Sequence, residues 1–359
     1  MKWSHAACLA AVAFASAASA QEGRRYRTQA GDVVVETVAS GLANPWGLAF
    51  LPDGRMLVTE RPGRLRVVTP EGRILPPMEG LGAVAIAAKG QGGLLDVALD
   101  PQFPENRMVY LSFAESRGGD RSGTSVMRAK LNEAGTALDG AQVIFRQEPA
   151  HTTSNHFGSR LVFDRDGNLF VTVGDRFTLR DQAQNPANHL GKVMHITRDG
   201  RPAPNNPFLQ REGVRPEIWS LGHRNVQGAA LNPATGELWI ADHGAKGGDE
   251  INIPQAGKNY GWPVITYGVD YSGAKIGEGT AKPGLEQPIH YWVPSIAPSG
   301  MAFYTGDKFP AWRGSVLVGA LAGELLTRLS LDGNRITGEE RMLQDLGERI
   351  RDVRQGPDG

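Results

Sequence analysis

The sequence predicts an all-β fold, a six-bladed β-propeller. Three observations carry this prediction: a repeated strand–turn–strand unit, the spacing of that unit, and an even distribution of turn residues. The 359 residues include 46 glycines and 23 prolines, spread along the chain rather than gathered in one segment. This composition favours many turns that join short strands.

The repeated unit is an apolar run, a turn rich in Pro, Asp, Asn or Gly, and a second apolar run, which together predict a tight hairpin. Successive units start about 49 to 71 residues apart. This spacing matches a four-stranded propeller blade with its loops, so six units predict six blades. The units occupy residues 48–58, 97–111, 161–171, 230–240, 301–318 and 353–359.

A propeller closes on itself and offers no linker, so residues 21–359 are predicted to form one domain. The sixth unit stops at its turn, which predicts a truncated last blade, and residues 33–37 are a candidate strand to complete it. The long segment 174–216 is expected to form loops gathered with others on one face, where binding residues commonly lie. A β-sandwich or an open repeat array with the same turns is the alternative fold.

The first twenty residues have the three parts of a secretory signal peptide. Lys2 is the positive start, residues 6–15 are the apolar core, and residues 18–20 read Ala-Ser-Ala. The apolar run is too short to span a bilayer, so no membrane insertion is expected. Cys8, the only cysteine of the sequence, lies in this segment. A mature chain without cysteine excludes disulfides and thiolate chemistry, and export without disulfides suggests a periplasmic location.

Charge and motifs exclude several classes of function. Without Lys2 the chain keeps 37 basic residues against 38 acidic ones, and no basic stripe indicates nucleic acid or an anionic membrane as a partner. The sequence has no dinucleotide-binding Gly-x-Gly-x-x-Gly motif after a strand, no Walker loop, no covalent haem motif and no zincin motif.

Two polar segments next to the repeat turns carry candidate catalytic residues. His156, in segment 154–160, is a candidate general base because the reference pKa of histidine is near neutrality. The alternative is a histidine that hydrogen-bonds a loop carbonyl. Arg224 and Asn225, in segment 221–228, are candidates to bind a carboxylate or an oxyanion. Alternatively, Arg224 ties two blades together.

Two further segments carry candidate binding sites. The glycine-rich segments 242–252 and 257–263 combine carboxylates with flexible backbone, which suits Ca²⁺; the alternative is a solvated turn. Arg349 and Arg351 alternate along one predicted strand, so both side chains are expected on the same face. Two adjacent guanidiniums favour an anionic ligand, or else they lie on an exposed strand edge.

Taken together, these segments resemble the soluble aldose sugar and glucose dehydrogenases that depend on pyrroloquinoline quinone (PQQ), the glucose/sorbosone dehydrogenase family. The resemblance covers essentially the whole mature chain. It depends on several short motifs that occur in the same order, including Asn-Pro-Trp-Gly at 44–47 and Pro-Ser-Ile-Ala-Pro-Ser-Gly at 294–300. The other motifs occupy residues 90–96, 156–161, 221–228, 247–252 and 258–263.

The resemblance implies a role for each candidate residue. His156 would be the base that takes the proton of the sugar C1 hydroxyl while hydride passes to PQQ, and Arg224 would stabilise charge on the reduced quinone. The implied cofactor-binding residues are Gln91, Arg224, Asn225, Tyr271, Arg349 and Arg351. Gly244 and Ala245 would offer carbonyls to a Ca²⁺ ion that also binds PQQ, and Glu250 and Tyr260 would be ligands of a second, structural Ca²⁺.

The implied reaction is oxidation of aldoses at C1 to lactones, with electrons passed to an external acceptor, a quinone or a cytochrome, by a monomer or homodimer. Two departures stand out: Asn155 replaces an aspartate that some relatives have beside the base, and segment 321–323 lacks a lysine that some relatives present to the cofactor. The alternatives are a calcium-dependent lactonase or esterase and a non-catalytic extracellular binding propeller.

Overall fold

The computed structural model describes residues 23–359 and confirms an all-β propeller. The predicted signal peptide at 1–20 lies outside the described residues. Across residues 23–359, no helix is both long and apolar enough to cross a bilayer.

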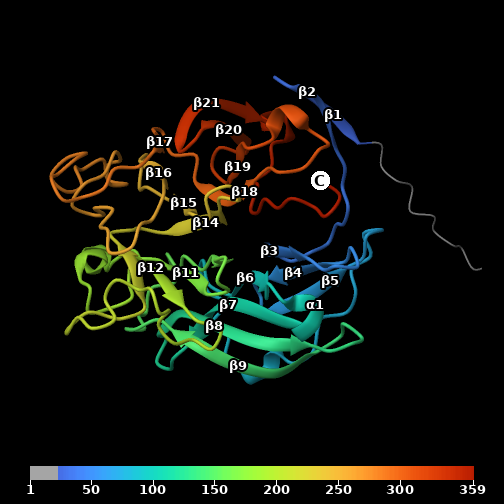
Figure 1. Cartoon of the computed structure of the whole chain (residues 1–359), viewed down its shortest axis with the longest axis horizontal. Helices are drawn as coiled ribbons and strands as arrows, with labels where there is room; N and C mark the ends of the chain where they lie inside the picture. The colour runs from blue at the N-terminus through green and yellow to red at the C-terminus, as the bar shows by residue number, and fades with distance from the viewer. Residues whose placement is uncertain (1–22) are drawn as a thin grey trace, which may run out of the picture.

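Five antiparallel sheets, each built from consecutive strands, follow one another around the ring in chain order (Figure 1). The first sheet has β3 (Pro45–Phe50), β4 (Met56–Glu60) and β5 (Arg64–Val68), and the second has β6 (Leu94–Leu99), β7 (Met108–Ser116), β8 (Ser122–Leu131) and β9 (Leu138–Arg146). The third has β10 (Leu161–Phe163), β11 (Leu169–Val173), β12 (Lys192–Ile196) and β13 (Ile218–Leu221). The fourth has β14 (Val226–Leu231), β15 (Leu238–Asp242), β16 (Asp249–Asn252) and β17 (His290–Trp292). The fifth has β18 (Pro298–Phe303), β19 (Val316–Ala320), β20 (Leu326–Asp332) and β21 (Arg335–Met342).

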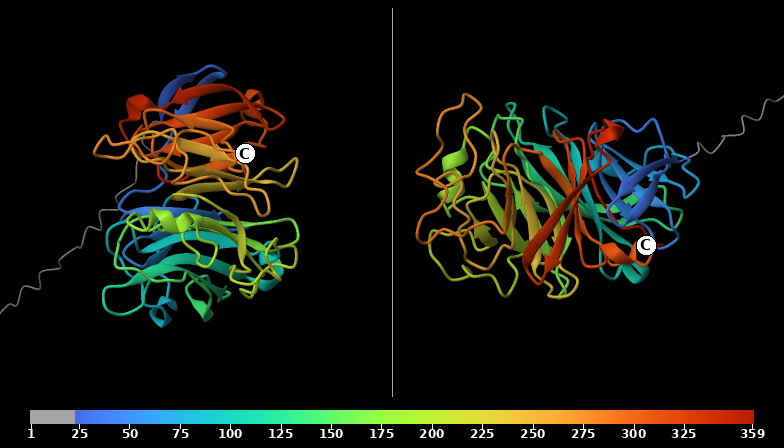
Figure 2. Two further views of the ribbon diagram at one scale, coloured as in Figure 1. Left: turned by 90° about the vertical axis from the view of Figure 1, so that its left-hand side faces the viewer. Right: turned by 90° about the horizontal axis from the view of Figure 1, so that it is seen from above.

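The helical elements of the described chain are short. They are α1 (Phe103–Asn106) and the 3₁₀ helices η1 (Leu81–Ala83), η2 (Arg180–Gln184), η3 (Pro310–Trp312) and η4 (Gln344–Leu346). The connection between β16 and β17, residues 253–289, projects from the sheets as long loops (Figure 2).

The first five repeat units form hairpins, as predicted, and each hairpin supplies the first two strands of a sheet. In the first unit Leu48 pairs with Val58, and Gly54 turns the chain with a φ of 85°, which glycine adopts without strain. The side chains that alternate inward from neighbouring sheets form the core: Leu57 and Leu111 lie in one cluster, and Trp239 and Val318 in another. The core therefore lies between adjacent blades, as a propeller requires.

The prediction of six blades is wrong for the described structure, which has five blade sheets. The sixth unit at 353–359 forms no strand, because its turn is paired with no second strand. Instead, residues 350–354 run in an extended path between the fifth and first sheets. Gly300 N–H of β18 donates to Arg351 O over 3.1 Å, and Arg354 Nε donates to Leu48 O of β3 over 3.1 Å.

Two smaller expectations also differ from the structure. Residues 33–37 were expected to complete the last blade, but β2 (Gly31–Val35) pairs with β1 (Arg24–Thr28) in a separate hairpin. Segment 174–216, expected to consist of loops, contains η2 and β12. Its buried run Lys192–Ile196 pairs with β11 and so becomes an internal strand of the third sheet.

Candidate active site

His156 lies in the connection that leads into β10, the first strand of the third sheet. Its backbone has a φ of 52°, a left-handed conformation that is uncommon for residues other than glycine, asparagine and aspartate. Two contacts hold this turn: the His156 N–H donates to Gln91 Oε1 over 2.8 Å, and the Gly158 N–H donates to Asn225 Oδ1 over 3.1 Å. Gln91 and Asn225, predicted to bind cofactor, therefore also fix the position of His156.

The His156 ring is oriented by a carboxylate that the sequence did not reveal. Nδ1–H donates to Asp175 Oδ1 over 2.6 Å, and the other oxygen of Asp175 accepts the indole N–H of Trp262 over 2.8 Å. Nε2 makes no hydrogen bond within residues 23–359, and this atom is not fully buried. The arrangement therefore leaves Nε2 free to accept a proton.

The environment keeps His156 neutral and Asp175 ionised. Burial lowers the pKa of His156 below its ordinary value of 6.5, and the neighbouring Asp175 only partly opposes this shift. Burial alone would raise the pKa of Asp175, but the hydrogen bond from His156, the charge of Arg224 and the Phe177 N–H lower it overall. A neutral imidazole with a fixed tautomer is the form that a general base requires.

Arg224 lies at the start of the fourth sheet, where a buried carboxylate fixes its backbone. Asp242 accepts the N–H groups of Arg224 and Asn225 over 2.9 and 2.6 Å. The Arg224 guanidinium donates through Nη1 to Gly244 O over 2.6 Å and through Nη2 to the Tyr271 hydroxyl over 3.3 Å. Its charge also acts on His156. A guanidinium at this position can stabilise an anionic oxygen in the site.

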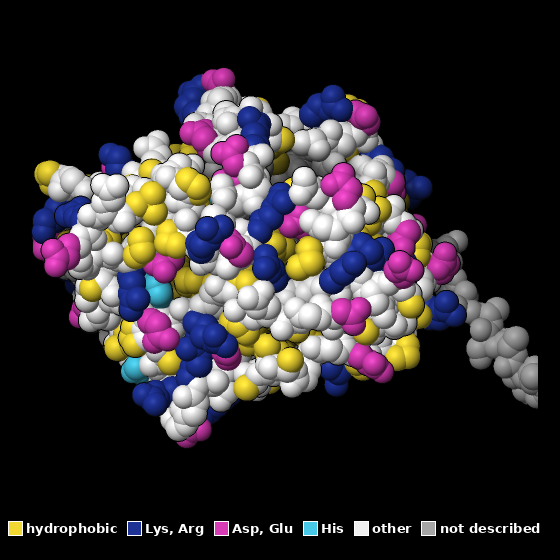
Figure 3. All heavy atoms as spheres, turned by 60° about the horizontal axis from the view of Figure 1, so that its bottom comes forward, with side chains coloured by type: hydrophobic (Ala, Val, Ile, Leu, Met, Phe, Trp, Pro, Cys, Tyr) yellow, Lys and Arg dark blue, Asp and Glu magenta, His cyan; other side chains and the backbone are white. Residues whose placement is uncertain are grey.

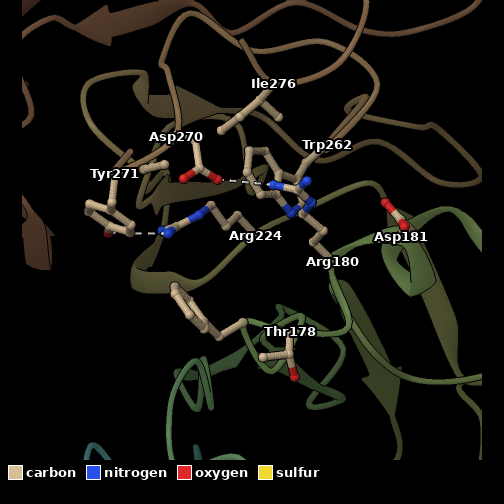
Figure 4. A pocket seen from close by; sticks show the side chains of 10 residues that line it. Thr178, Arg180, Asp181, Arg224, Trp262, Asp270, Tyr271 and Ile276 are labelled. Carbon is tan, nitrogen blue, oxygen red and sulfur yellow. Dashed lines mark hydrogen bonds and ion pairs between the residues drawn. The ribbon is translucent and has the colours of Figure 1, made fainter. Parts of the chain in front are cut away.

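A pocket of about 480 Å³ opens beside these residues (Figure 4). Its lining residues include Arg224, Trp262, Tyr271, Phe177 and Arg180. Tyr271 is 58% exposed, and the ring of Phe177 packs edge-on against His156 with centroids 5.1 Å apart. Arg180 Nη1 and Asp270 Oδ2 form an ion pair of 3.3 Å that joins the two loops of the rim.

A second pocket of about 290 Å³ brings together Arg349, Arg351 and Gln91. The sequence predicted that both arginine side chains would lie on the same face of a strand. Both line this pocket, although residues 349–351 form no strand. No carboxylate lines the pocket. The Nε2 atom of His243, another lining residue, is buried without a hydrogen-bond partner in the described residues. These features suit a ligand that carries carboxylates and hydrogen-bonding oxygens.

Two of the oxygen atoms predicted to bind calcium are already hydrogen-bonded within the fold. Ala245 lines the 480 Å³ pocket, but the Gly244 carbonyl accepts from Arg224, so an ion there would have to share that oxygen. The Tyr260 hydroxyl is used within the fold, because it donates to Ile253 O over 2.6 Å and accepts the Gln255 N–H over 3.0 Å. Within residues 23–359, no hydrogen bond joins Glu250 to Tyr260.

Glu250 nonetheless lies in surroundings that favour a cation. Burial, with Asp242 and Asp249 nearby, raises its pKa to about 8. Its Oε2 accepts the amide of Asn252 over 3.0 Å, and the buried Oδ1 of Asn252 has no hydrogen-bond partner in the part of the chain that the structure describes. A carboxylate and an unpaired amide oxygen are donors that Ca²⁺ accepts. No group of three or more His, Cys, Asp or Glu side chains in residues 23–359 could hold a metal by itself.

Asp175, Trp262 and Phe177 were missed by the sequence-based reasoning. Asp175 follows the third repeat hairpin directly, at the end of β11 (Leu169–Val173), and a polar residue after a buried strand was the available signal. The backbone at this point is crowded: a Cβ atom on Gly174 would lie 2.2 Å from His156 O. Gly174 therefore lets the backbone that follows β11 approach the His156 carbonyl and brings Asp175 next to the His156 ring.

Replacement of Asp175 by asparagine tests this orientation. In Asp175→Asn we expect kcat to fall by about 10²- to 10⁴-fold, because the amide can stabilise the wrong imidazole tautomer. KM should change far less, since Asp175 does not line either pocket. Steady-state kinetics of the cofactor-loaded enzyme would measure both constants. A variant within threefold of the wild-type kcat would show that Asp175 does not orient the base.

The comparisons with known proteins identify the class. The family model described as "Glucose / Sorbosone dehydrogenase" matches residues 42–359. The chain belongs to this family, which confirms the resemblance and the predicted enzyme class, a sugar dehydrogenase.

Individual relatives support the same assignment. The chain is 46% identical to aldose sugar dehydrogenase YliI of Escherichia coli strain K12, over 91% of this chain and 88% of that protein. A crystal structure of a glucose dehydrogenase superposes with a TM-score of 0.88 at 50% identity, covering 90% of this chain and 94% of the other. The PQQ-bound aldose sugar dehydrogenase of Streptomyces coelicolor superposes with a TM-score of 0.75 at 32% identity, covering 91% and 89%.

Proposed function

We propose that this protein is a periplasmic, PQQ-dependent dehydrogenase that oxidises aldoses at C1 to lactones and passes the electrons to an external quinone or cytochrome. The observation that carries the proposal is the buried His156–Asp175 pair beside Arg224, with an arginine-lined pocket next to it. The reaction removes a hydride from C1 and a proton from the C1 hydroxyl. PQQ, when bound, supplies the two-electron acceptor for that hydride.

The chain's own residues perform the remaining tasks. His156 Nε2 takes the proton of the C1 hydroxyl, and Asp175 stabilises the imidazolium that results. Arg224 stabilises negative charge on an oxygen in the 480 Å³ pocket, where its Nη2 already donates to Tyr271. Arg349 and Arg351 bind cofactor carboxylates. The rim of Phe177, Trp262 and Tyr271 provides apolar ring faces for the sugar.

Two Ca²⁺ ions are part of the proposal. One would be bound through the carbonyls of Gly244 and Ala245 next to the cofactor. The other would be bound at Glu250 and the main chain of Tyr260, since the Tyr260 hydroxyl is already hydrogen-bonded. A cation at Glu250 would offset the burial, and the repulsion from Asp242 and Asp249, that together raise the pKa of this carboxylate.

The surface fits a small-molecule enzyme better than a nucleic-acid or membrane-surface protein. Acidic and basic side chains are interspersed on the face shown in Figure 3, in keeping with a formal net charge of zero for the whole chain. We propose a monomer or homodimer that does not insert into the membrane.

The deciding experiment is dye-linked oxidation of glucose and several other aldoses by purified apo-protein, with and without PQQ and Ca²⁺. We expect activity only when both are added. Hydrolysis of a lactone without any electron acceptor would instead indicate the lactonase alternative. Neither activity, with no change in PQQ absorbance on mixing, would indicate a binding propeller.

The pH dependence of the loaded enzyme gives a second test. A base acts in its neutral form, and the pKa of His156 is lowered from 6.5. The acidic limb of kcat/KM should therefore lie below pH 6.5, with a plateau above it. In Asp175→Asn the limb should move still lower, because the carboxylate that raises the pKa of His156 is gone. A limb above pH 6.5 in the wild type would contradict the assignment of His156 as the base.

A further inference from the structure

The pocket that holds Arg349 and Arg351 contains a third arginine, Arg61, which directly follows β4 of the first sheet. Arg61 was not a candidate residue in the sequence. Acidic residues are absent from the lining of this pocket, so its three guanidiniums share no internal counter-charge there. The charges act on one another: burial, together with the charges of Arg160, Arg349 and Arg61, lowers the pKa of Arg351 to about 10.

Two of the three nitrogen atoms of the Arg61 guanidinium make hydrogen bonds that hold it in place. Nε donates to Gly92 O over 3.2 Å, and Nη2 donates to Gly90 O. These two carbonyls flank Gln91, whose side chain accepts the His156 N–H. Nη1 makes no hydrogen bond within residues 23–359, so a fixed, charged donor remains available in the pocket. Arg349, which is exposed, makes no side-chain hydrogen bond in the same residues either.

The three arginines are the cationic side chains of this pocket. Leu321, Ala297 and Trp46, which also line it, carry no charge. PQQ carries three carboxylates, and each carboxylate is best bound by a planar guanidinium.

We propose that Arg61 is a cofactor-binding residue and forms, with Arg349 and Arg351, an all-arginine site for a tricarboxylate. This inference rests on the proposed PQQ dependence and adds a residue to it. The site provides one guanidinium for each carboxylate, and Arg61 also links cofactor binding to the Gln91 loop that fixes the turn of His156.

The test is equilibrium binding of PQQ to the apo-protein, followed by quenching of protein fluorescence over a range of salt concentrations. In Arg61→Gln we expect Kd to rise by about 10- to 100-fold, since a charge-assisted hydrogen bond is lost. The dependence of Kd on salt should also weaken, because one charge fewer faces the ligand. Arg73→Gln, the same change at an exposed arginine on the turn after β5, should leave both unchanged.

Arg61→Lys separates anion binding from a purely structural role. Lysine keeps the charge but cannot bridge the Gly90 and Gly92 carbonyls as the guanidinium does. If Arg61 binds the ligand, Arg61→Lys should keep the wild-type salt dependence with an intermediate Kd. If Arg61 only holds the loop, both variants should weaken binding equally and keep the wild-type salt dependence, which would overturn the proposal.

A quinone-free probe distinguishes this inference from the proposed function. Benzene-1,2,4-tricarboxylate should compete with PQQ for the wild type and compete less well for Arg61→Gln. Wild-type protein that binds no PQQ would refute the proposed function itself. Wild-type binding that Arg61→Gln leaves unchanged would refute only the role of Arg61. If Arg61→Gln does not fold, as judged by thermal unfolding, the salt dependence of Arg61→Lys decides.

Discussion

Replacing His156 by asparagine is expected to lower kcat by at least about 10³-fold while PQQ still binds. The loss follows from removal of the base that takes the C1 hydroxyl proton, since general-base catalysis typically contributes about 10²- to 10⁴-fold. Cofactor binding should persist, because His156 lines neither pocket and Arg349 and Arg351 remain in place. Steady-state turnover and PQQ titration of the same preparation would measure the two effects separately.

The choice of asparagine matters because His156 has a φ of 52°. Asparagine tolerates the left-handed conformation, whereas alanine there costs about 1 kcal/mol or more. Comparison of His156→Asn with His156→Ala therefore separates loss of the base from strain in the turn. His290→Asn, at a histidine on β17 outside both pockets, is the control and should keep wild-type turnover. If His156→Asn retained turnover within tenfold of the wild type, another group would have to be the base.

The hairpins of the fold could be predicted because their signals are local. A Pro, Asp or Gly turn between two apolar runs determines the pairing of Leu48 with Val58 without reference to the rest of the chain. The number of blades could not be read in the same way. A sheet needs partner strands as well as a turn, and the turn at 353–359 has none in the described structure.

The candidate site was predictable to the extent that its residues occur in short motifs. Arg224, Arg349 and Arg351 line the two pockets, His156 packs against Phe177 of the larger one, and each of the four belongs to a segment beside a repeat turn. Asp175 and Arg61 lack such a motif. Asp175 reaches His156 only because two strand ends meet across a glycine, and Arg61 reaches the arginine pocket only when the ring closes. Contacts of this kind depend on tertiary structure.

Four buried or partly buried charged side chains meet where the ring closes. Asp96 on β6 contacts Arg160 over 3.1 Å and Arg354 over 3.0 Å, and Arg160 also contacts Asp352 over 3.0 Å. The side chains of Asp96 and Arg160 are 0% and 1% exposed. Asp352 and Arg354 belong to the extended segment that joins the fifth sheet to the first. The network therefore links the second and third sheets to the segment that stands in place of a sixth sheet.

We expect Asp96→Asn to lower the free energy of unfolding by about 3–5 kcal/mol, because one partner of a buried ion pair is removed and two arginines are left facing one carboxylate. The substitution keeps the side-chain volume, so the loss cannot be attributed to a cavity. Denaturant unfolding monitored by tryptophan fluorescence would measure it. Asp332→Asn makes the same chemical change in the exposed pair Asp332–Arg335, whose side chains are 71% and 74% exposed, and should change stability by less than about 1 kcal/mol.

A double-mutant cycle shows whether the charges act together. Asp96→Asn and Arg354→Met remove the two sides of one contact, so their effects should be less than additive by about 0.5–3 kcal/mol. Coupling of that size would mean that the segment 350–354 is held to the second sheet by charge and not only by its hydrogen bonds to Leu48 and Gly300. Additive losses would show that each group is stabilised separately. In that case closure of the ring would depend on the backbone contacts to β3 and β18, and the buried charges would contribute to stability only through their own blades.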